Sequence, residues 1–271
     1  MVPLVAVPYM GEVGRRLCEN ADIGWIDLSG NALIRAKDLF VRVEGRPNRF
    51  KTAGRPPDVF APKSARIARW LLMHPDEAWT QRELARSTGM DEGFVSRIVK
   101  RLAVADLVSR DESGRVRSRD ANLLLDAWAE TYRFENHTIL KGHVAARSGE
   151  DLVNTVADRL GSAKLRYAAT GLAAAWLYCR FASFRLASFY LAEEPTADLP
   201  DRIGFREDPR GANLWLVLPK DMGVFQETRV IRDVTCVHPV QVYLDLAGHP
   251  ERAPEAAERL RADFLKPGAH D

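Results

Sequence analysis

The chain has 271 residues, of which 46% are hydrophobic and 28% charged, and its net charge is +2. This composition is typical of a globular protein with two or three domains and excludes a disordered chain. No apolar run approaches the length of a membrane span, and the N-terminus lacks a basic region and a cleavage site, so we expect a cytoplasmic protein with no membrane partner.

Basic residues gather in one third of the sequence. Residues 32–119 contain nineteen Lys and Arg against eleven Asp and Glu, whereas the rest of the chain contains twenty against twenty-six. Such asymmetry suggests a localised anionic partner. Chance clustering on a solvated face remains an alternative that charge alone does not exclude.

The first segment, residues 1–57, has a helix-like stretch over 11–21 and strand-like stretches over 24–34 and 39–45. Turn signals, "SGN" and "AKD", break the strand-like part. A Pro/Gly/Arg-rich stretch over 44–62 has no apolar periodicity, which predicts a basic linker.

The second segment, residues 58–120, is predicted to be mostly helical. Its first helix lies in "KSARIARWLLMHP", with Ile67, Trp70 and Leu71 on the core side. Thr80 followed by Glu83 is a capping box, so a helix begins at Gln81. Gly89 ends that helix.

The next helix is capped by Asp91 and carries residues 94–102. Val95, Ile98, Val99 and Leu102 form an apolar stripe at spacings of three and four. The residues that fall away from it are Phe94, Ser96, Arg97, Lys100 and Arg101.

This arrangement is what a recognition helix needs, because side chains near its N-terminus meet base edges while cations hold phosphates. We expect Arg97 to reach a guanine edge. Lys100 and Arg101 suit phosphates, and Ser96 suits either group.

A strand, a turn and a second strand follow in "DLVSRDESGRVRS". The turn is 111–114, and Arg115, Arg117 and Arg119 alternate, which places them on one face of the hairpin. A hairpin of this kind beside a basic helix predicts a winged helix. The predicted DNA-binding residues are Thr80, Gln81, Arg82, Phe94, Ser96, Arg97, Lys100, Arg101, Arg115, Arg117 and Arg119.

The stretch "TQRELARSTGMDEGFVSRIVKRLAVADLVSR" with its wing resembles the MarR-like winged-helix family over about sixty residues. The resemblance implies double-stranded DNA as a partner and a homodimer, with residues 121–133 as the expected interface. The alternative is a winged helix used only for protein contacts. RNA is less favoured, because strands with exposed aromatic residues are missing.

In the first segment, the "WIDLSGN" turn and the strand after it resemble the later half of a restriction-endonuclease-like domain. Such nucleases hold a metal ion with paired acids and a lysine. Only Asp27 and Glu44 are available here, and Arg46 stands where the lysine is wanted. We therefore predict an inactive remnant, or a small packing or dimerisation unit.

The third segment, residues 121–271, alternates helix-like and strand-like stretches, which predicts an α+β protein overall. The helix-like stretches are 122–132, 149–161, 239–248 and 254–265, and the strand-like ones are 165–169, 184–192, 213–219 and 229–237. Leu172, Trp176 and Cys179 form a stripe that we assign to the core.

A strand is followed by Thr170-Gly171, an Ala-rich helix and another strand. This order of elements is similar to a nucleotidyltransferase-like core. An active member carries two carboxylates one residue apart on that second strand to hold magnesium. Residues 184–191 contain none, and Glu193 and Glu194 are adjacent at its end. We therefore predict a degenerate domain, no catalysis and no cofactor.

Cysteine and histidine give no metal motif. Cys18, Cys179 and Cys236 are scattered and odd in number, which predicts reduced, half-buried thiols. The set His238, Asp245 and His249 suggests a metal site or an acid–base pair. We favour capping or helix-terminus roles, because each histidine precedes a proline at an expected helix boundary.

The ending "HPVQVYLDLAGHPERAPEAAERLR", together with the winged helix, resembles the AbiEi-type antitoxins of type IV toxin–antitoxin systems. The resemblance implies a transcriptional regulator that represses its own promoter, with a nucleotidyltransferase-like toxin as a further partner. Two alternatives stay open. One is a nucleic-acid-directed nucleotidyltransferase or nuclease, and the other is a protein-interaction module without DNA specificity.

Overall fold

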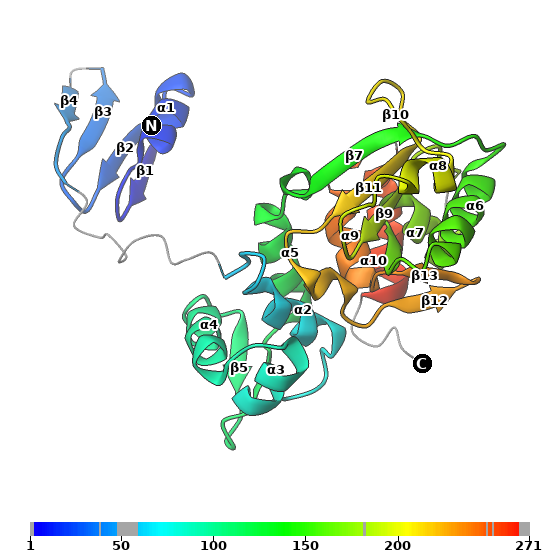
Figure 1. Cartoon of the computed structure of the whole chain (residues 1–271). Coiled ribbons are helices and arrows are strands. Elements are labelled where there is room, and N and C mark those ends of the chain that lie inside the picture. Colours follow the sequence, from blue (N-terminus) through cyan, green and yellow to red (C-terminus); the bar gives the residue numbers. More distant parts are fainter. Residues whose placement is uncertain are drawn as a thin grey trace. The chain divides into compact units, whose positions relative to one another are not determined.

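The computed structural model describes residues 3–37, 39–47, 59–180, 183–247, 249–250 and 252–265 (Figure 1). They belong to two compact units, Met1–Pro57 and Asp58–Asp271. Most of the linker predicted over 44–62 lies outside the described residues. None of the helices in the described ranges is long and apolar enough to cross a membrane.

The first unit is a small sheet with one helix. Its elements are β1 (Leu4–Val7), α1 (Glu12–Asn20), β2 (Gly24–Asp27), β3 (Ala32–Ala36) and β4 (Leu39–Val43). Helix α1 connects β1 to β2, and these two strands pair in parallel. β2, β3 and β4 are antiparallel neighbours. Trp25, Leu33 and Met10 form its buried core. The helix and the "SGN" turn are confirmed, whereas β1 was not predicted.

The second unit begins with a winged helix. Its elements are α2 (Ala65–Met73), α3 (Gln81–Thr88), α4 (Glu92–Val104), β5 (Val108–Arg110) and β6 (Val116–Ser118). Ile67, Leu84, Val95 and Leu102 are completely buried and bring the three helices and the hairpin together around one core.

Local sequence signals set the helix ends as predicted. The Thr80 hydroxyl accepts the Glu83 N–H while the Glu83 carboxylate accepts the Thr80 N–H, so the capping box is confirmed. Gly89 takes a left-handed φ of 66° after α3, a conformation that glycine adopts without strain.

The wing is a two-stranded hairpin of β5 and β6, with an isolated bridge from Trp79 beside it. The Asp111 carboxylate accepts the backbone N–H groups of Ser113 and Arg115, which shapes the predicted turn. Trp79 pairs with Val116 through two backbone hydrogen bonds, of 2.8 and 2.7 Å. The base of the wing is therefore tied to the segment that leads into α3.

The rest of the unit is built on one large sheet. In the described part of the chain its strands follow the order β10-β7-β11-β9-β8-β13-β12. The remaining elements are α5 (Ala121–Thr131), η1 (Phe134–Asn136), β7 (Thr138–His143), α6 (Gly149–Ser162), β8 (Tyr167–Thr170), α7 (Gly171–Cys179), β9 (Ala187–Leu191), α8 (Leu199–Ile203), β10 (Arg206–Glu207), β11 (Leu214–Leu218), η2 (Met222–Phe225), β12 (Arg229–Ile231), β13 (Val234–Cys236), α9 (Pro239–Leu246) and α10 (Ala253–Phe264). The protein is therefore a mixed α/β chain.

Besides β1 and the two-residue β10, which were not predicted, two strand assignments differ from the sequence prediction. The strand predicted over 229–237 is a hairpin, because Arg232 and Asp233 take φ values of 51° and 65° and form a two-residue turn between β12 and β13. β7 was missed, since Lys141, Gly142 and His143 give its second half no alternating pattern; its pairing with β11 supplies the register instead.

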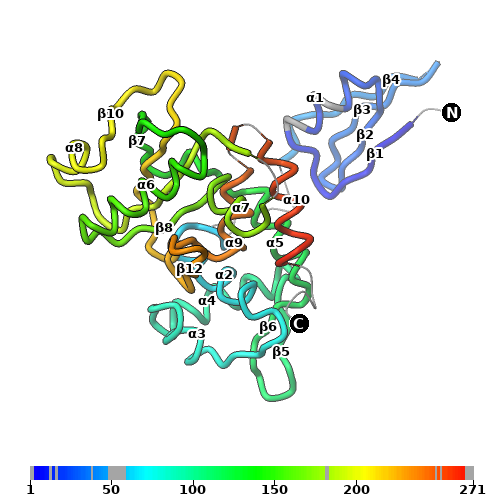
Figure 2. The backbone as a smooth tube through the Cα atoms, turned by 90° about the vertical axis from the view of Figure 1, so that its right-hand side faces the viewer, coloured from blue at the N-terminus to red at the C-terminus, as the bar shows by residue number. Residues whose placement is uncertain are grey.

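The winged helix and the large sheet share buried surface. α2 packs against α5 and α9, which lie beside it in Figures 1 and 2. Val240 and Leu244 of α9 belong to the same apolar cluster as Ile67 of α2. The domain boundary predicted at residue 120 stays a prediction, and so do the endonuclease-like and nucleotidyltransferase-like assignments.

Candidate DNA interface

Helix α4 has one face in the core and one in solvent. Asp91 caps it by accepting the Phe94 N–H at 2.7 Å, and the helix begins at Glu92. The apolar stripe is confirmed, because Val95, Ile98, Val99 and Leu102 are each no more than 2% exposed. That packing fixes which side chains face outward.

The outward face carries cations around an aromatic ring. Arg97 and Lys100 are exposed, and Ser96 and Arg101 are half-buried. The Arg97 guanidinium lies 5.7 Å from the centre of the Phe94 ring, and Lys63 Nζ lies 5.5 Å from the same centre. Lys63 precedes α2 and joins this surface only through the fold, so the sequence pattern did not reveal it.

Several of the predicted DNA-binding side chains contact the protein itself. Thr80 is occupied by its capping box. Arg82 pairs with Glu92 across the α3–α4 turn, with Nε and Oε1 3.2 Å apart. Arg119 pairs with Asp106. The predicted residues that remain outside α4 are Gln81, Arg115 and Arg117. Arg82 and Arg119 still face solvent, with 87% and 56% of their side chains exposed, so their ion pairs are weak surface contacts.

Arg115 joins the wing to α3. It donates to the Ala78 carbonyl oxygen at 3.0 Å and to both carboxylate oxygens of Glu83, the nearer at 3.0 Å. Hydrogen bonds from Thr80, then the charge of Arg115, lower the pKa of Glu83 despite partial desolvation. One carboxylate therefore caps α3 and anchors the wing.

The free cations form the candidate interface. In the described ranges, no ion pair involves Arg97, Lys100, Arg101 or Arg117. Two exposed arginines that were not predicted, Arg86 on α3 and Arg110 on β5, also lack one there. These side chains are available to an anionic partner without breaking an internal pair.

His238, Asp245 and His249 do not form a metal site. Within the described residues, no group of three His, Cys, Asp or Glu side chains is arranged to hold a metal ion. The capping role is confirmed for His238, whose Nδ1 accepts the Val240 N–H at the start of α9.

Asp245, one turn before His249 in sequence, is engaged by other residues. It is fully buried and accepts hydrogen bonds from Tyr132, Thr170, Tyr190 and Gln241. Burial raises its pKa to about 6, although the four donors oppose that shift. Gln241 lies one turn before it on α9, whereas Tyr132, Thr170 and Tyr190 are distant in sequence, so no spacing revealed those three.

His249 lies just after α9 as predicted, where its backbone N–H donates to the Leu246 carbonyl oxygen at 3.1 Å, and its side chain is buried. Its Nε2 lies 2.9 Å from the Ser188 hydroxyl, and its ring lies against Phe134 and Trp215. Burial lowers its pKa to about 4, so the imidazole is neutral near pH 7.

In the first unit, Asp27 is a structural residue. Its carboxylate accepts the backbone N–H groups of Met10 and Asn31 and the Asn31 side-chain amide. Burial raises its pKa, but the hydrogen bonds outweigh that effect and the net shift is downward. Asn31 also bonds both backbone groups of Arg46, so the predicted Asp27 and Arg46 do come together, around an amide.

The three cysteines are free thiols. Cys18 and Cys179 are half-buried as predicted, whereas Cys236 is fully buried. Leu172 lies in the core, and Trp176 and Cys179 pack against its edge. β9 is entirely buried and carries no carboxylate.

Helix-turn-helix, wing and a solvent-facing basic helix define a winged-helix DNA-binding regulator. Comparison with protein families agrees: the MarR family matches residues 60–117. The family described as "Transcriptional regulator, AbiEi antitoxin, Type IV TA system" matches residues 115–266, more than half of the chain. The chain therefore belongs to the AbiEi antitoxin family and is a DNA-binding regulatory antitoxin. No curated protein and no solved structure matches it.

Proposed function

We propose that α4 is the recognition helix and enters the major groove of operator DNA. The observation that carries this proposal is the pairing of a completely buried apolar stripe with exposed cations that have no ion-pair partner among the described residues. Arg97 lies in the first half of the helix, where side chains reach base edges, and Lys100 lies one turn later, where phosphates are met.

The ion pairs set the geometry of the reading elements. Arg82–Glu92 holds α3 to the start of α4, and Arg115–Glu83 holds the wing to α3. We assign Arg82 and Arg115 to positioning, and Arg117, Arg110 and Lys63 to backbone contacts beside the groove.

The protein acts as a homodimer that represses its own promoter. Two recognition helices then occupy successive major grooves of a pseudo-palindrome, about 34 Å apart. The exposed Leu123 on α5 supports a contact there, in keeping with the interface expected over 121–133. The large sheet serves the toxin contact, and it is non-catalytic because β9 lacks the carboxylates that would hold magnesium.

Fluorescence anisotropy tests the proposal, with duplex DNA from the protein's own upstream region and a scrambled duplex. A specific site is expected to bind at least about a thousandfold more tightly than the scrambled one. Arg97→Ala should cost about 1–3 kcal/mol and relax specificity, because it removes a bidentate base contact. Lys100→Ala should weaken binding to both duplexes. It should also reduce by about one the slope of log affinity against log salt concentration.

Arg206→Ala is the matched control, because Arg206 is an exposed cation on β10, outside the winged helix. It should bind as the wild type does. Equal weak binding to both duplexes, with no effect of Arg97→Ala, would assign the basic face to protein contacts instead.

A further inference from the structure

A cavity of about 110 Å³ lies where the winged helix meets the large sheet. Its wall includes Phe60 before α2, Arg69 of α2, Trp128 of α5, His137 before β7 and Gln241 of α9. No part of the DNA interface described above lines it.

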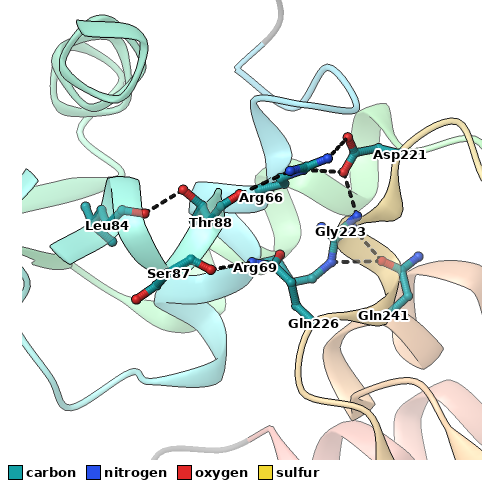
Figure 3. A network of polar contacts seen from close by, with 9 residues as sticks. All are labelled: Arg66, Arg69, Leu84, Ser87, Thr88, Asp221, Gly223, Gln226 and Gln241. Carbon is teal, nitrogen blue, oxygen red and sulfur yellow. Dashed lines mark hydrogen bonds and ion pairs between the residues drawn. The ribbon is translucent and has the colours of Figure 1, made fainter. Parts of the chain in front are cut away.

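Arg69 is the unusual member of the wall. Its side chain is buried, with the residue only 3% exposed, and its guanidinium lies 5.0 Å from the centre of the Trp128 ring. Nε and Nη2 both donate to Oε1 of Gln241, at 3.1 and 2.7 Å (Figure 3). Nη1 is buried and has no hydrogen-bond partner among the described residues.

The nearby carboxylates are already engaged. Asp221 receives two hydrogen bonds from Arg66, of 2.7 and 2.8 Å (Figure 3). The Asp245 carboxylate accepts a hydrogen bond of 2.7 Å from the side-chain amide of Gln241, so Gln241 lies between Asp245 and Arg69. Arg69 is thus a buried cation without a direct anionic partner, and desolvation lowers its pKa. Buried charges are costly unless they are paired.

The rest of the cavity favours an anion with an apolar part. Exposed Arg133 and Lys220 line it as well, and His137 is neutral because burial, with Arg69 and Lys220, lowers its pKa to about 4. Phe60 and Trp128 stack with ring centres 5.9 Å apart and supply an apolar wall. Asp221 is the one carboxylate in the described lining, and Arg66 neutralises it.

We propose that this cavity binds a small organic carboxylate, whose anionic end pairs with Arg69 and whose apolar end lies against Phe60 and Trp128. An engineered cavity of about 150 Å³ holds benzene, so a volume near 110 Å³ suits an acid of three or four carbons. A carboxylate in the cavity beside Arg69 compensates the buried charge. This binding does not depend on the identity of the operator.

Isothermal titration calorimetry of the full chain tests the proposal, with acetate, propionate, butyrate, propionamide and inorganic phosphate as probes. Propionate is expected to bind saturably and at least about tenfold more tightly than propionamide, which has the same shape but no charge. Each added methylene should tighten binding about fourfold until the cavity is full.

Arg69→Met should remove at least about nine-tenths of the affinity for propionate, whereas Arg110→Met, an exposed arginine on β5, should leave it unchanged. If Arg69→Met does not fold, Lys220→Met provides the test, with a loss of about threefold expected from a cation at the surface. Equal binding of propionate and propionamide overturns the proposal, as does no saturation by any acid. Phosphate binding more tightly than every carboxylate overturns it too, in favour of an inorganic-anion site.

Discussion

Acid should destabilise the protein through its buried histidines, and His249→Gln should remove much of that effect. His249 is 8% exposed, and its Nδ1 has no partner among the described residues, so a proton there is poorly accommodated. Burial lowers its pKa to about 4. In the unfolded chain, a histidine titrates near pH 6.5.

The sign follows from proton linkage. Below about pH 6.5 this histidine binds a proton in the unfolded chain but not in the folded protein. The free energy of unfolding therefore decreases as the pH falls toward 4. Between pH 7 and 5 this amounts to about 2 kcal/mol for His249. His137, whose pKa is also about 4, acts in the same direction by a similar amount.

Protonation of Asp245 has the opposite effect on stability from protonation of the two histidines. Its pKa in the folded protein is about 6, above the value of about 4 for an unfolded chain, so the folded state binds this proton first. Acidification from pH 7 to 5 then adds about 1 kcal/mol of stability. The three groups together give a net loss of about 2–3 kcal/mol.

Urea unfolding at pH 7, 6 and 5 measures the effect. His249→Gln should lose about 2 kcal/mol less than the wild type over this range, and Asp245→Asn about 1 kcal/mol more. Ser188→Ala keeps the imidazole and removes only its partner, so it should retain the wild-type slope. If the wild type and His249→Gln show parallel stability curves, the burial argument for His249 is refuted.

Three further outcomes follow from the geometry. Gly171→Ala should cost at least about 3 kcal/mol in thermal unfolding, because φ is +58° and a Cβ would lie 2.3 Å from Nε2 of His249. Glu83→Ala should lower the melting temperature and weaken operator binding, since it removes both the capping box and the wing's anchor. Burial raises the pKa of Cys179 to about 11 and of Cys236 to about 12, so both should react with a thiol reagent at pH 8 at least about tenfold more slowly in the native protein than in guanidinium.

Local signals carried the prediction of the winged helix. The capping box at Thr80, the turn at Gly89 and the stripe from Val95 to Leu102 are all relations between residues fewer than eight apart, and each was confirmed. Such relations depend on helix geometry alone, which the sequence encodes directly. The same reasoning identified the outward face of α4.

The relations that failed or were missed span longer distances. Asp245 has a spacing to His249 that suggests a pair, yet its partners Tyr132, Thr170 and Tyr190 lie 113, 75 and 55 residues away. Lys63 reaches Phe94 in the same way, through the packing of α2 near α4. A spacing rule cannot find contacts that only the tertiary fold creates.

The wing shows how both kinds of relation act on one residue type. Arg115, Arg117 and Arg119 alternate as predicted, since Val116 and Ser118 between them are buried. Yet Arg115 is held by Glu83 and Arg119 by Asp106, and in the described part of the chain Arg117 has no such ion pair. An arginine that already anchors the wing contributes to DNA binding by fixing where the wing lies. The free Arg117 contributes through its own charge, so variants of Arg115 and Arg117 should differ in how DNA binding depends on salt. Arg117→Ala should reduce the slope of log affinity against log salt concentration. Arg115→Ala should weaken binding chiefly by loosening the wing.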